Sequence, residues 1–84
     1  MAGYHLADIE KGVYGQPSKI FEEVAEFKDA LEQRNPVMEL CELSDLVGAI
    51  KGYLSNRYGG TVTLSDLDVM AEATEKAFKS GRRA

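Results

Sequence analysis

The segment from Val37 to Leu54 constrains the fold most, because it is apolar almost all round. Ten apolar side chains recur at helical spacing within it: Met38, Leu40, Cys41, Leu43, Leu46, Val47, Ala49, Ile50, Tyr53 and Leu54. A helix with this pattern is covered on most of its sides in a folded protein. The chain has 84 residues, and a domain of this size buries only roughly 60% of its unfolded surface. We therefore expect a second copy of the chain to complete the core.

Helix-start signals divide the chain into an arm and a helical part. Residues 1–17 contain three glycines and no sustained period, which predicts a loop or an extended arm. Apolar residues then recur at helical spacing over about 18–33. Asn35 is suited to capping a second helix, and Pro36 to occupying its first turn.

A third helix is predicted after Gly59 and Gly60, which end the second. Thr63 and Asp66 resemble a capping box, and Gly81 is a natural stop. The expected core stripe of this helix consists of Leu64, Leu67, Ala71, Thr74 and Phe78. The predicted fold is all-α: one domain over 1–84, with an arm (1–17) and a core (18–83) of three antiparallel neighbouring helices that forms a four-helix bundle on dimerisation.

Composition excludes several classes of protein. The net charge of −4 disfavours binding to nucleic-acid polymers, which relies on clustered Lys and Arg. A single cysteine excludes an internal disulfide and a thiolate metal cage. The sequence shows no signal-peptide pattern and no apolar run of about 18 residues. A cytoplasmic protein without a membrane partner is therefore expected.

The negative charge is concentrated between residues 22 and 45. That segment has eight acidic residues against Lys28 and Arg34, a net charge of −6, so that the rest of the chain carries +2. The acids are Glu22, Glu23, Glu26, Asp29, Glu32, Glu39, Glu42 and Asp45. Concentrated carboxylates repel one another unless a cation lies among them.

Helical register selects two of these acids on the first helix. Glu23 and Glu26 flank the apolar stripe, whereas Glu22 points nearly opposite to it. The i, i+3 spacing places Glu23 and Glu26 on one face about a turn apart. They are the pair best placed to face a crevice between helices.

On the second helix, carboxylates stand among leucines and valines. Glu39 falls inside the main apolar stripe, and Glu42 and Asp45 flank it, with no Lys or Arg between Pro36 and Ile50. Buried carboxylates are costly unless they are paired, hydrogen-bonded or bound to a metal. Glu23, Glu26, Glu42 and Asp45 therefore indicate a site for a hard divalent cation, Mg²⁺, with Mn²⁺ as a substitute.

The same acids carry a family resemblance. Glu22-Glu23-Val24-Ala25-Glu26 matches EExxE and Glu42-Leu43-Ser44-Asp45 matches ExxD, with fifteen residues between them. This combination resembles the MazG-like all-α nucleoside triphosphate pyrophosphohydrolases, and especially their small, phage-type, single-domain members. The resemblance implies a MazG-like fold that binds Mg²⁺ through Glu23, Glu26, Glu42 and Asp45. It also implies cleavage of the α–β phosphoanhydride of a (deoxy)nucleotide to a monophosphate and pyrophosphate.

Within this interpretation, Glu22 or Glu39 is the candidate general base, and the sequence does not choose between them. Phosphate contacts are expected from Lys19, Lys76, Lys79 and Arg82, although basic residues at a helix C-terminus also complement the macrodipole. The working protein is expected to be a homodimer or a dimer of dimers.

Two further residues have simpler interpretations. His5, the single histidine, is expected at the surface of the arm, with contact to the nucleotide as the alternative, and Cys41 is expected to be a small core residue. Two alternative functions remain: a non-catalytic helical module that dimerises through its second helix, and an enzyme like the phosphoribosyl-ATP pyrophosphohydrolases.

Overall fold

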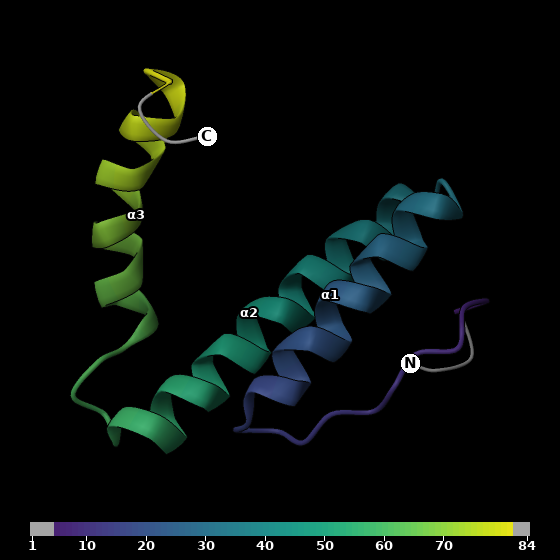
Figure 1. Ribbon diagram of the computed structural model, residues 1–84, viewed down its shortest axis with the longest axis horizontal. Coiled ribbons are helices and arrows are strands. Elements are labelled where there is room, and N and C mark those ends of the chain that lie inside the picture. The colour runs from purple at the N-terminus through teal and green to yellow at the C-terminus, as the bar shows by residue number, and fades with distance from the viewer. Residues whose placement is uncertain (1–4, 82–84) are drawn as a thin grey trace.

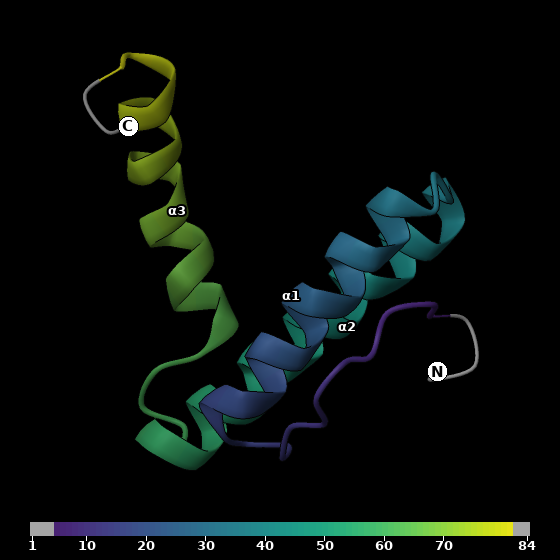
Figure 2. The same cartoon turned by 45° about the vertical axis from the view of Figure 1, so that its right-hand side comes forward.

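The computed structural model describes residues 5–81, and within that range the protein is entirely helical, with no strand. The helices are α1 (Pro17–Glu32), α2 (Pro36–Tyr58) and α3 (Leu64–Lys79). Residues 5–16 form an extended arm that runs beside the α1–α2 pair (Figures 1 and 2). The all-α prediction and the three helices are confirmed. Among the described residues, no helix is both long enough and apolar enough to cross a membrane.

Local capping signals explain where the helices begin and end. The side chain of Asn35 accepts a hydrogen bond from the Met38 N–H at 3.1 Å, and Pro36 occupies the first turn of α2. Gly59 ends α2 in the left-handed conformation, with φ 60°, where a Cβ would be unfavourable. Thr63 and Asp66 form the predicted capping box at the start of α3.

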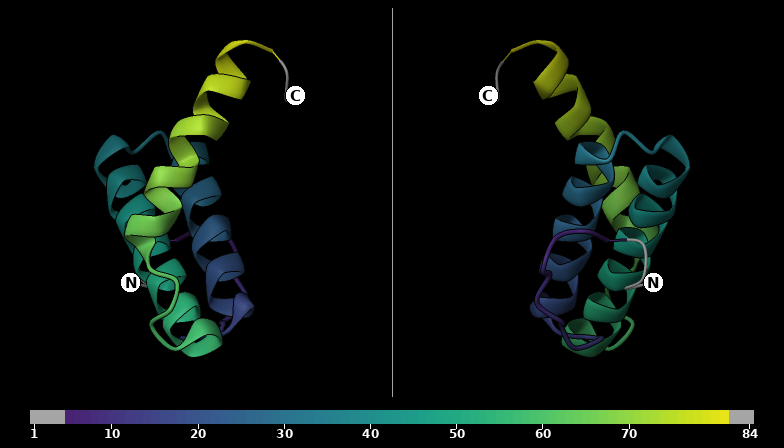
Figure 3. Two further views of the ribbon diagram at one scale, coloured as in Figure 1. Left: turned by 90° about the vertical axis from the view of Figure 1, so that its left-hand side faces the viewer. Right: turned by 90° about the vertical axis from the view of Figure 1, so that its right-hand side faces the viewer.

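α1 and α2 form an antiparallel hairpin, and the arm is fixed to it. Asn56 Nδ2 donates a hydrogen bond to the Gly15 carbonyl at 2.9 Å. The Tyr14 ring lies against Gly52, where an added Cβ would meet the ring at 2.5 Å. These contacts hold the arm across the two helices (Figure 3, right).

α3 stands apart from this hairpin, which corrects the prediction of three helices packed as neighbours within one chain. It contacts α2 alone among the helices, and it points away from the α1–α2 pair (Figures 1 and 2). None of the residues of α3 is buried. Among the described residues, its predicted core stripe is at most half-buried, and Phe78 is 58% exposed.

The buried and exposed residues of α1 and α2 also differ from those that the sequence predicts. The buried face of α1 carries four acids and one alanine, whereas its large apolar residues Phe21, Val24 and Leu31 are exposed. On α2, Val37, Leu40, Leu43 and Val47 are exposed. Cys41 is exposed as well, which corrects its assignment to the core. Much of the apolar surface of both helices thus faces outward, and the acidic face of α1 lies inside the hairpin together with Met38, Ala49 and Leu54 of α2.

Candidate functional site

The α1–α2 hairpin brings four carboxylates together. Oxygen atoms of Glu23 and Glu26 on α1 and of Glu42 and Asp45 on α2 all lie within 4.8 Å of one another. The first three residues are buried and Asp45 is exposed. These are the four acids that the helical register and the two motifs selected. Their donor set consists of carboxylate oxygen alone, which suits Mg²⁺.

One atom of this cluster is chemically unsatisfied. Within residues 5–81, Oε2 of Glu23 is buried and has no hydrogen-bond partner, while Oε1 lies 3.2 Å from the Lys19 ammonium. A buried oxygen without a partner is destabilising. A cation between the helices would supply the missing partner, so the residues present fit the metal that the motifs imply.

Burial and mutual repulsion shift the protonation of the cluster. Burial raises the pKa of Glu26 above its ordinary value, and the neighbouring Glu42 raises it further. Burial likewise raises the pKa of Glu23, and Glu26 adds to this effect, while Lys19 opposes it. Burial is thus the main cause of both raised pKa values, and the neighbouring carboxylates add to it.

Glu22 also lies inside the hairpin, although its position on the helical wheel predicted that it would point away from the apolar stripe. It is buried, because the stripe itself faces outward. Its Oε1 accepts hydrogen bonds from the Gly12 N–H at 2.8 Å and from Lys19 Nζ at 3.2 Å. Burial opposes ionisation, but these donors outweigh it and lower the pKa of Glu22. Lys11 Nζ lies 3.7 Å from its other oxygen.

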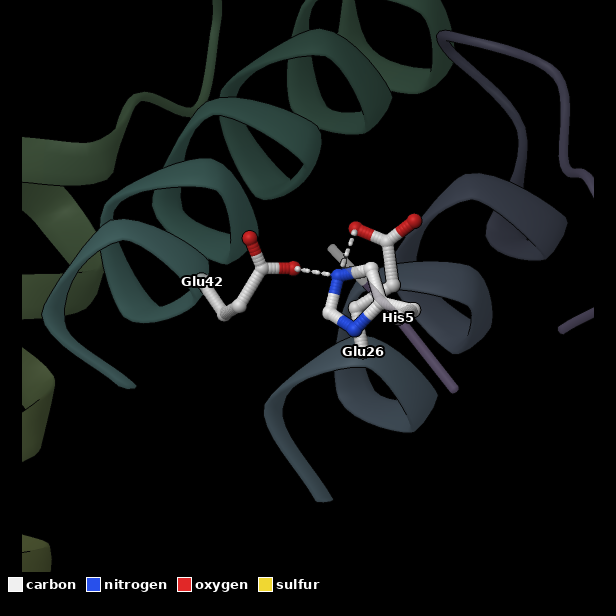
Figure 4. Close-up of side chains that lie close together, drawn as sticks. All are labelled: His5, Glu26 and Glu42. Atoms are coloured by element: carbon white, nitrogen blue, oxygen red, sulfur yellow. Dashed lines mark hydrogen bonds and ion pairs between the residues drawn. The ribbon is translucent and has the colours of Figure 1, made fainter. Parts of the chain in front are cut away.

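His5 is the functional candidate whose position differs most from the sequence interpretation. Its side chain is 3% exposed, which corrects its assignment to the surface, and its ring lies between carboxylates of both helices (Figure 4). Nε2 is 3.2 Å from Glu42 Oε2 and 3.7 Å from Glu26 Oε2. Burial disfavours the charged ring, but the hydrogen bond to Asp29 and the charges of Glu26 and Glu42 prevail and raise the pKa of His5.

Asp29 holds the arm and His5 in place. Its carboxylate accepts hydrogen bonds from the His5 ring at 2.8 Å, from the Leu6 and Ala7 N–H groups at 3.2 Å each, and from Gln33 at 2.7 Å. The hydrogen bond from His5 is the main cause of the lowered pKa of Asp29. Asp29 lies one turn after Glu26, and this spacing was the available sign that it shares the acidic face.

A cavity of about 600 Å³ opens beside the cluster. Its lining combines acids with three lysines: Lys11, Gly12, Tyr14, Lys19, Glu22, Glu23, Glu26, Ser44, Asp45, Gly48, Ala49 and Lys51. Sites for small molecules have volumes of roughly 300 to 1,000 Å³. Carboxylates and ammonium groups side by side are suited to a metal ion and a polyanion bound together.

The remaining candidates are not part of this arrangement. Glu39 is half-buried on α2 and belongs to neither group of possible metal ligands among the described residues. Lys76 and Lys79 lie on α3, which does not contact α1, and Lys79 pairs with Glu75 at 2.7 Å. Arg82 lies outside the described residues.

Comparisons of the chain with protein-family models, with curated proteins and with solved structures gave no match.

Proposed function

We propose that the protein is a Mg²⁺-dependent nucleoside triphosphate pyrophosphohydrolase of the MazG-like type. The observation that carries the proposal is the convergence of Glu23, Glu26, Glu42 and Asp45 within 4.8 Å, beside a cavity with lysines in its wall. The EExxE and ExxD motifs supply these same four residues, which supports the reaction class.

The four carboxylates would hold Mg²⁺ through oxygen atoms of both helices. When bound, Mg²⁺ would offset the charge of the triphosphate and lower the pKa of the attacking water. The unpartnered Glu23 oxygen supports this role, because the protein leaves a buried anion without a donor where the cation would lie. Asp45 is exposed, so the site is open on one side to a phosphate chain.

The lysines of the cavity would bind and orient the substrate. Lys19 is half-buried and contacts Glu22 and Glu23, so it is fixed at the edge of the acidic cluster. Lys11 and Lys51 stand in the same wall. Their ammonium groups would stabilise the charge that develops on the departing pyrophosphate. Lys76 and Lys79 would take part only if α3 of another copy approached the cavity.

Between the two candidates for the general base, we favour Glu22. It lines the cavity, and Gly12 and Lys19 fix its carboxylate there. Glu39 does not line the cavity among the described residues. Glu22 would accept the proton of the attacking water either directly or through a second water molecule.

We propose further that the working unit is a homodimer or a dimer of dimers with a four-helix core. Phe21 on α1 and Leu40 on α2 are 68% and 69% exposed, and α3 lies away from its own hairpin. Exposed apolar surface on all three helices is typical of a protein that associates. A second copy would cover these faces.

The test is pyrophosphate release from a panel of ribo- and deoxynucleoside triphosphates and phosphoribosyl-ATP, with Mg²⁺. We expect turnover by the wild type and a loss of at least about 100-fold in Glu42→Gln and Asp45→Asn. Glu72→Gln, an exposed acid on α3, is the matched control and should keep full activity. Negligible release by all proteins, together with no Mg²⁺ binding, would leave the non-catalytic dimerisation module as the better assignment.

A further inference from the structure

We propose that His5, Glu26 and Glu42 form a second cation position, which takes a first-row transition ion such as Mn²⁺ or Co²⁺. The His5 Nε2 atom and one oxygen of each glutamate lie within 4.8 Å of one another. This position adjoins the all-oxygen position and shares Glu26 and Glu42 with it. The inference therefore rests on the proposed metal site, which it extends from one kind of ion to two.

The orientation of the His5 ring is the first argument. Nδ1 lies 2.8 Å from Asp29 Oδ2. The other hydrogen bonds to that carboxylate come from donors: the Leu6 and Ala7 N–H groups and the Gln33 amide. The Asp29 carboxylate accepts each of these hydrogen bonds. The hydrogen of the His5–Asp29 bond is therefore on Nδ1 of His5. The second nitrogen, Nε2, is then the atom presented to the helices.

A carboxylate behind a histidine is the usual support of a metal-bound imidazole. Such a carboxylate fixes the tautomer and the ring orientation and makes the coordinating nitrogen more basic. Asp29 supplies that support in advance, because the arm and α1 hold it through the N–H groups of Leu6 and Ala7 and the side chain of Gln33. Asp29 is thus a positioning residue and not itself a ligand in this group.

The distances agree with donors around one ion. Nε2 is 3.2 Å from Glu42 Oε2 and 3.7 Å from Glu26 Oε2 (Figure 4). Two donors about 2.1 Å from one ion lie roughly 3.0 Å apart at octahedral angles and roughly 3.4 Å apart at tetrahedral angles. Small shifts of side chains would therefore place all three donors on one ion.

The burial of the ligands and the charge around them agree with a cation at this position. The three side chains are between 1% and 4% exposed. The neighbouring Glu23 Oε2, buried in the same cluster, has no hydrogen-bond partner among residues 5–81. With His5 neutral as a ligand, Lys19 is the one cation that contacts Glu23 among the described residues, and two metal ions offset the remaining negative charge better than one.

The donor chemistry separates the two positions. Imidazole nitrogen favours ions of the first transition series, whereas Mg²⁺ favours oxygen and keeps much of its water shell. We therefore assign Mg²⁺ to the position made by Glu23, Glu26, Glu42 and Asp45. The position with His5 would select Mn²⁺ or Co²⁺.

The experiment is pulsed electron paramagnetic resonance of Mn²⁺ bound to the full, tag-free chain. His5 is the single histidine of the sequence, so imidazole nitrogen coupling can come from no other residue. We expect nitrogen coupling in the wild type and none in His5→Gln. Titration with CoCl2 should show a 10- to 100-fold weaker affinity in Asp29→Asn. MgCl2 affinity should not fall in either variant, because neither His5 nor Asp29 is a ligand of the all-oxygen position.

The outcomes separate this inference from the proposed function. Bound Mn²⁺ without imidazole coupling in the wild type overturns the second position, and Mg²⁺-dependent pyrophosphate release would still support the enzyme. Imidazole coupling in a protein that releases no pyrophosphate supports the second position and overturns the enzyme. Failure of both Mn²⁺ and Mg²⁺ to bind overturns both. The decisive measurement is made on the wild type, so it does not depend on the folding of a variant.

Discussion

The backbone N–H of Gly12 donates a 2.8 Å hydrogen bond to Oε1 of Glu22, and this contact joins the arm to the acidic face of α1. Gly12 also lies against the first turn of the helix. A Cβ built on Gly12 would overlap the Ser18 carbonyl and the Lys19 backbone nitrogen. Only glycine lets the arm approach α1 closely enough to cover Glu22.

Gly12→Ala should therefore detach the arm from the site. The overlap should cost about 1 to 3 kcal/mol of stability, or roughly 4 to 8 °C in Tm for each kcal/mol. Hydrogen exchange should become faster in residues 5–16. Thermal unfolding and exchange measured by mass spectrometry test this expectation.

Gly48→Ala is the control for that substitution. Nothing lies within 4 Å of a Cβ built on Gly48, in the middle of α2. Alanine is favoured over glycine in a helix by about 1 kcal/mol, so this variant should be as stable as the wild type or more stable. Equal stability of Gly12→Ala and the wild type would contradict the close approach of the arm.

Glu42→Gln should stabilise the metal-free protein while it removes the response to metal. Glu42 is 1% exposed and faces Glu26 and His5, so its loss relieves repulsion between buried carboxylates. We expect a gain of about 0.5 to 2 kcal/mol in EDTA. In the wild type, MgCl2 at about 100 times its Kd should add about 2.7 kcal/mol.

The measurement is thermal unfolding with EDTA and with MgCl2. Glu72→Gln should respond to MgCl2 as the wild type does, because Glu72 is exposed on α3. If Glu42→Gln destabilised the metal-free protein, the carboxylate would be a structural partner of His5 and not a strained ligand.

The helix boundaries were predictable because they depend on local chemistry. Asn35, Pro36, Gly59 and the Thr63–Asp66 box act within a few residues of one another, so the sequence alone defines them. The position of α3 was not predictable in this way. It depends on which surface covers the apolar stripe of α3, and the described residues of one chain cover that stripe only in part.

The same distinction between local spacing and long-range contacts applies to the residues of the site. The convergence of Glu26 and Glu42 follows from register on two antiparallel helices, which sequence spacing encodes. The burial of His5 depends on the arm folding back over 24 residues to Asp29, and no periodic pattern reports such a contact. Cys41 was wrongly placed in the core because its apolar surroundings on α2 turned out to be an exposed face.

The metal-free protein should lose stability as the pH rises above 6.5. His5 has a folded-state pKa above its ordinary value of 6.5. Its contribution is therefore fully present below pH 6.5 and is lost as the pH rises through the raised value. The raised pKa values of Glu23 and Glu26 act in the same sense from about pH 4.5 upward.

Thermal unfolding in EDTA at a series of pH values tests this expectation. His5→Gln should lack the loss of stability above pH 6.5, because glutamine does not titrate. At the acidic end, the lowered pKa values of Glu22 and Asp29 mean that their stabilisation is lost as the pH falls. The same slope above pH 6.5 in His5→Gln and the wild type would refute the role of the imidazole.

Leu43→Lys should dissociate the expected homodimer. Leu43 is 40% exposed on α2, on the helix whose apolar residues exceed what α1 covers. A lysine at a buried interface would leave an unpaired charge, which typically costs several kcal/mol. Sedimentation velocity at micromolar concentration should show a dimer or a tetramer for the wild type and a monomer for the variant.

Leu6→Lys, on the exposed arm, is the matched control and should assemble as the wild type does. A monomeric wild type would show instead that the outward apolar faces of α1 and α2 stay in water, and the four-helix core would have to be abandoned.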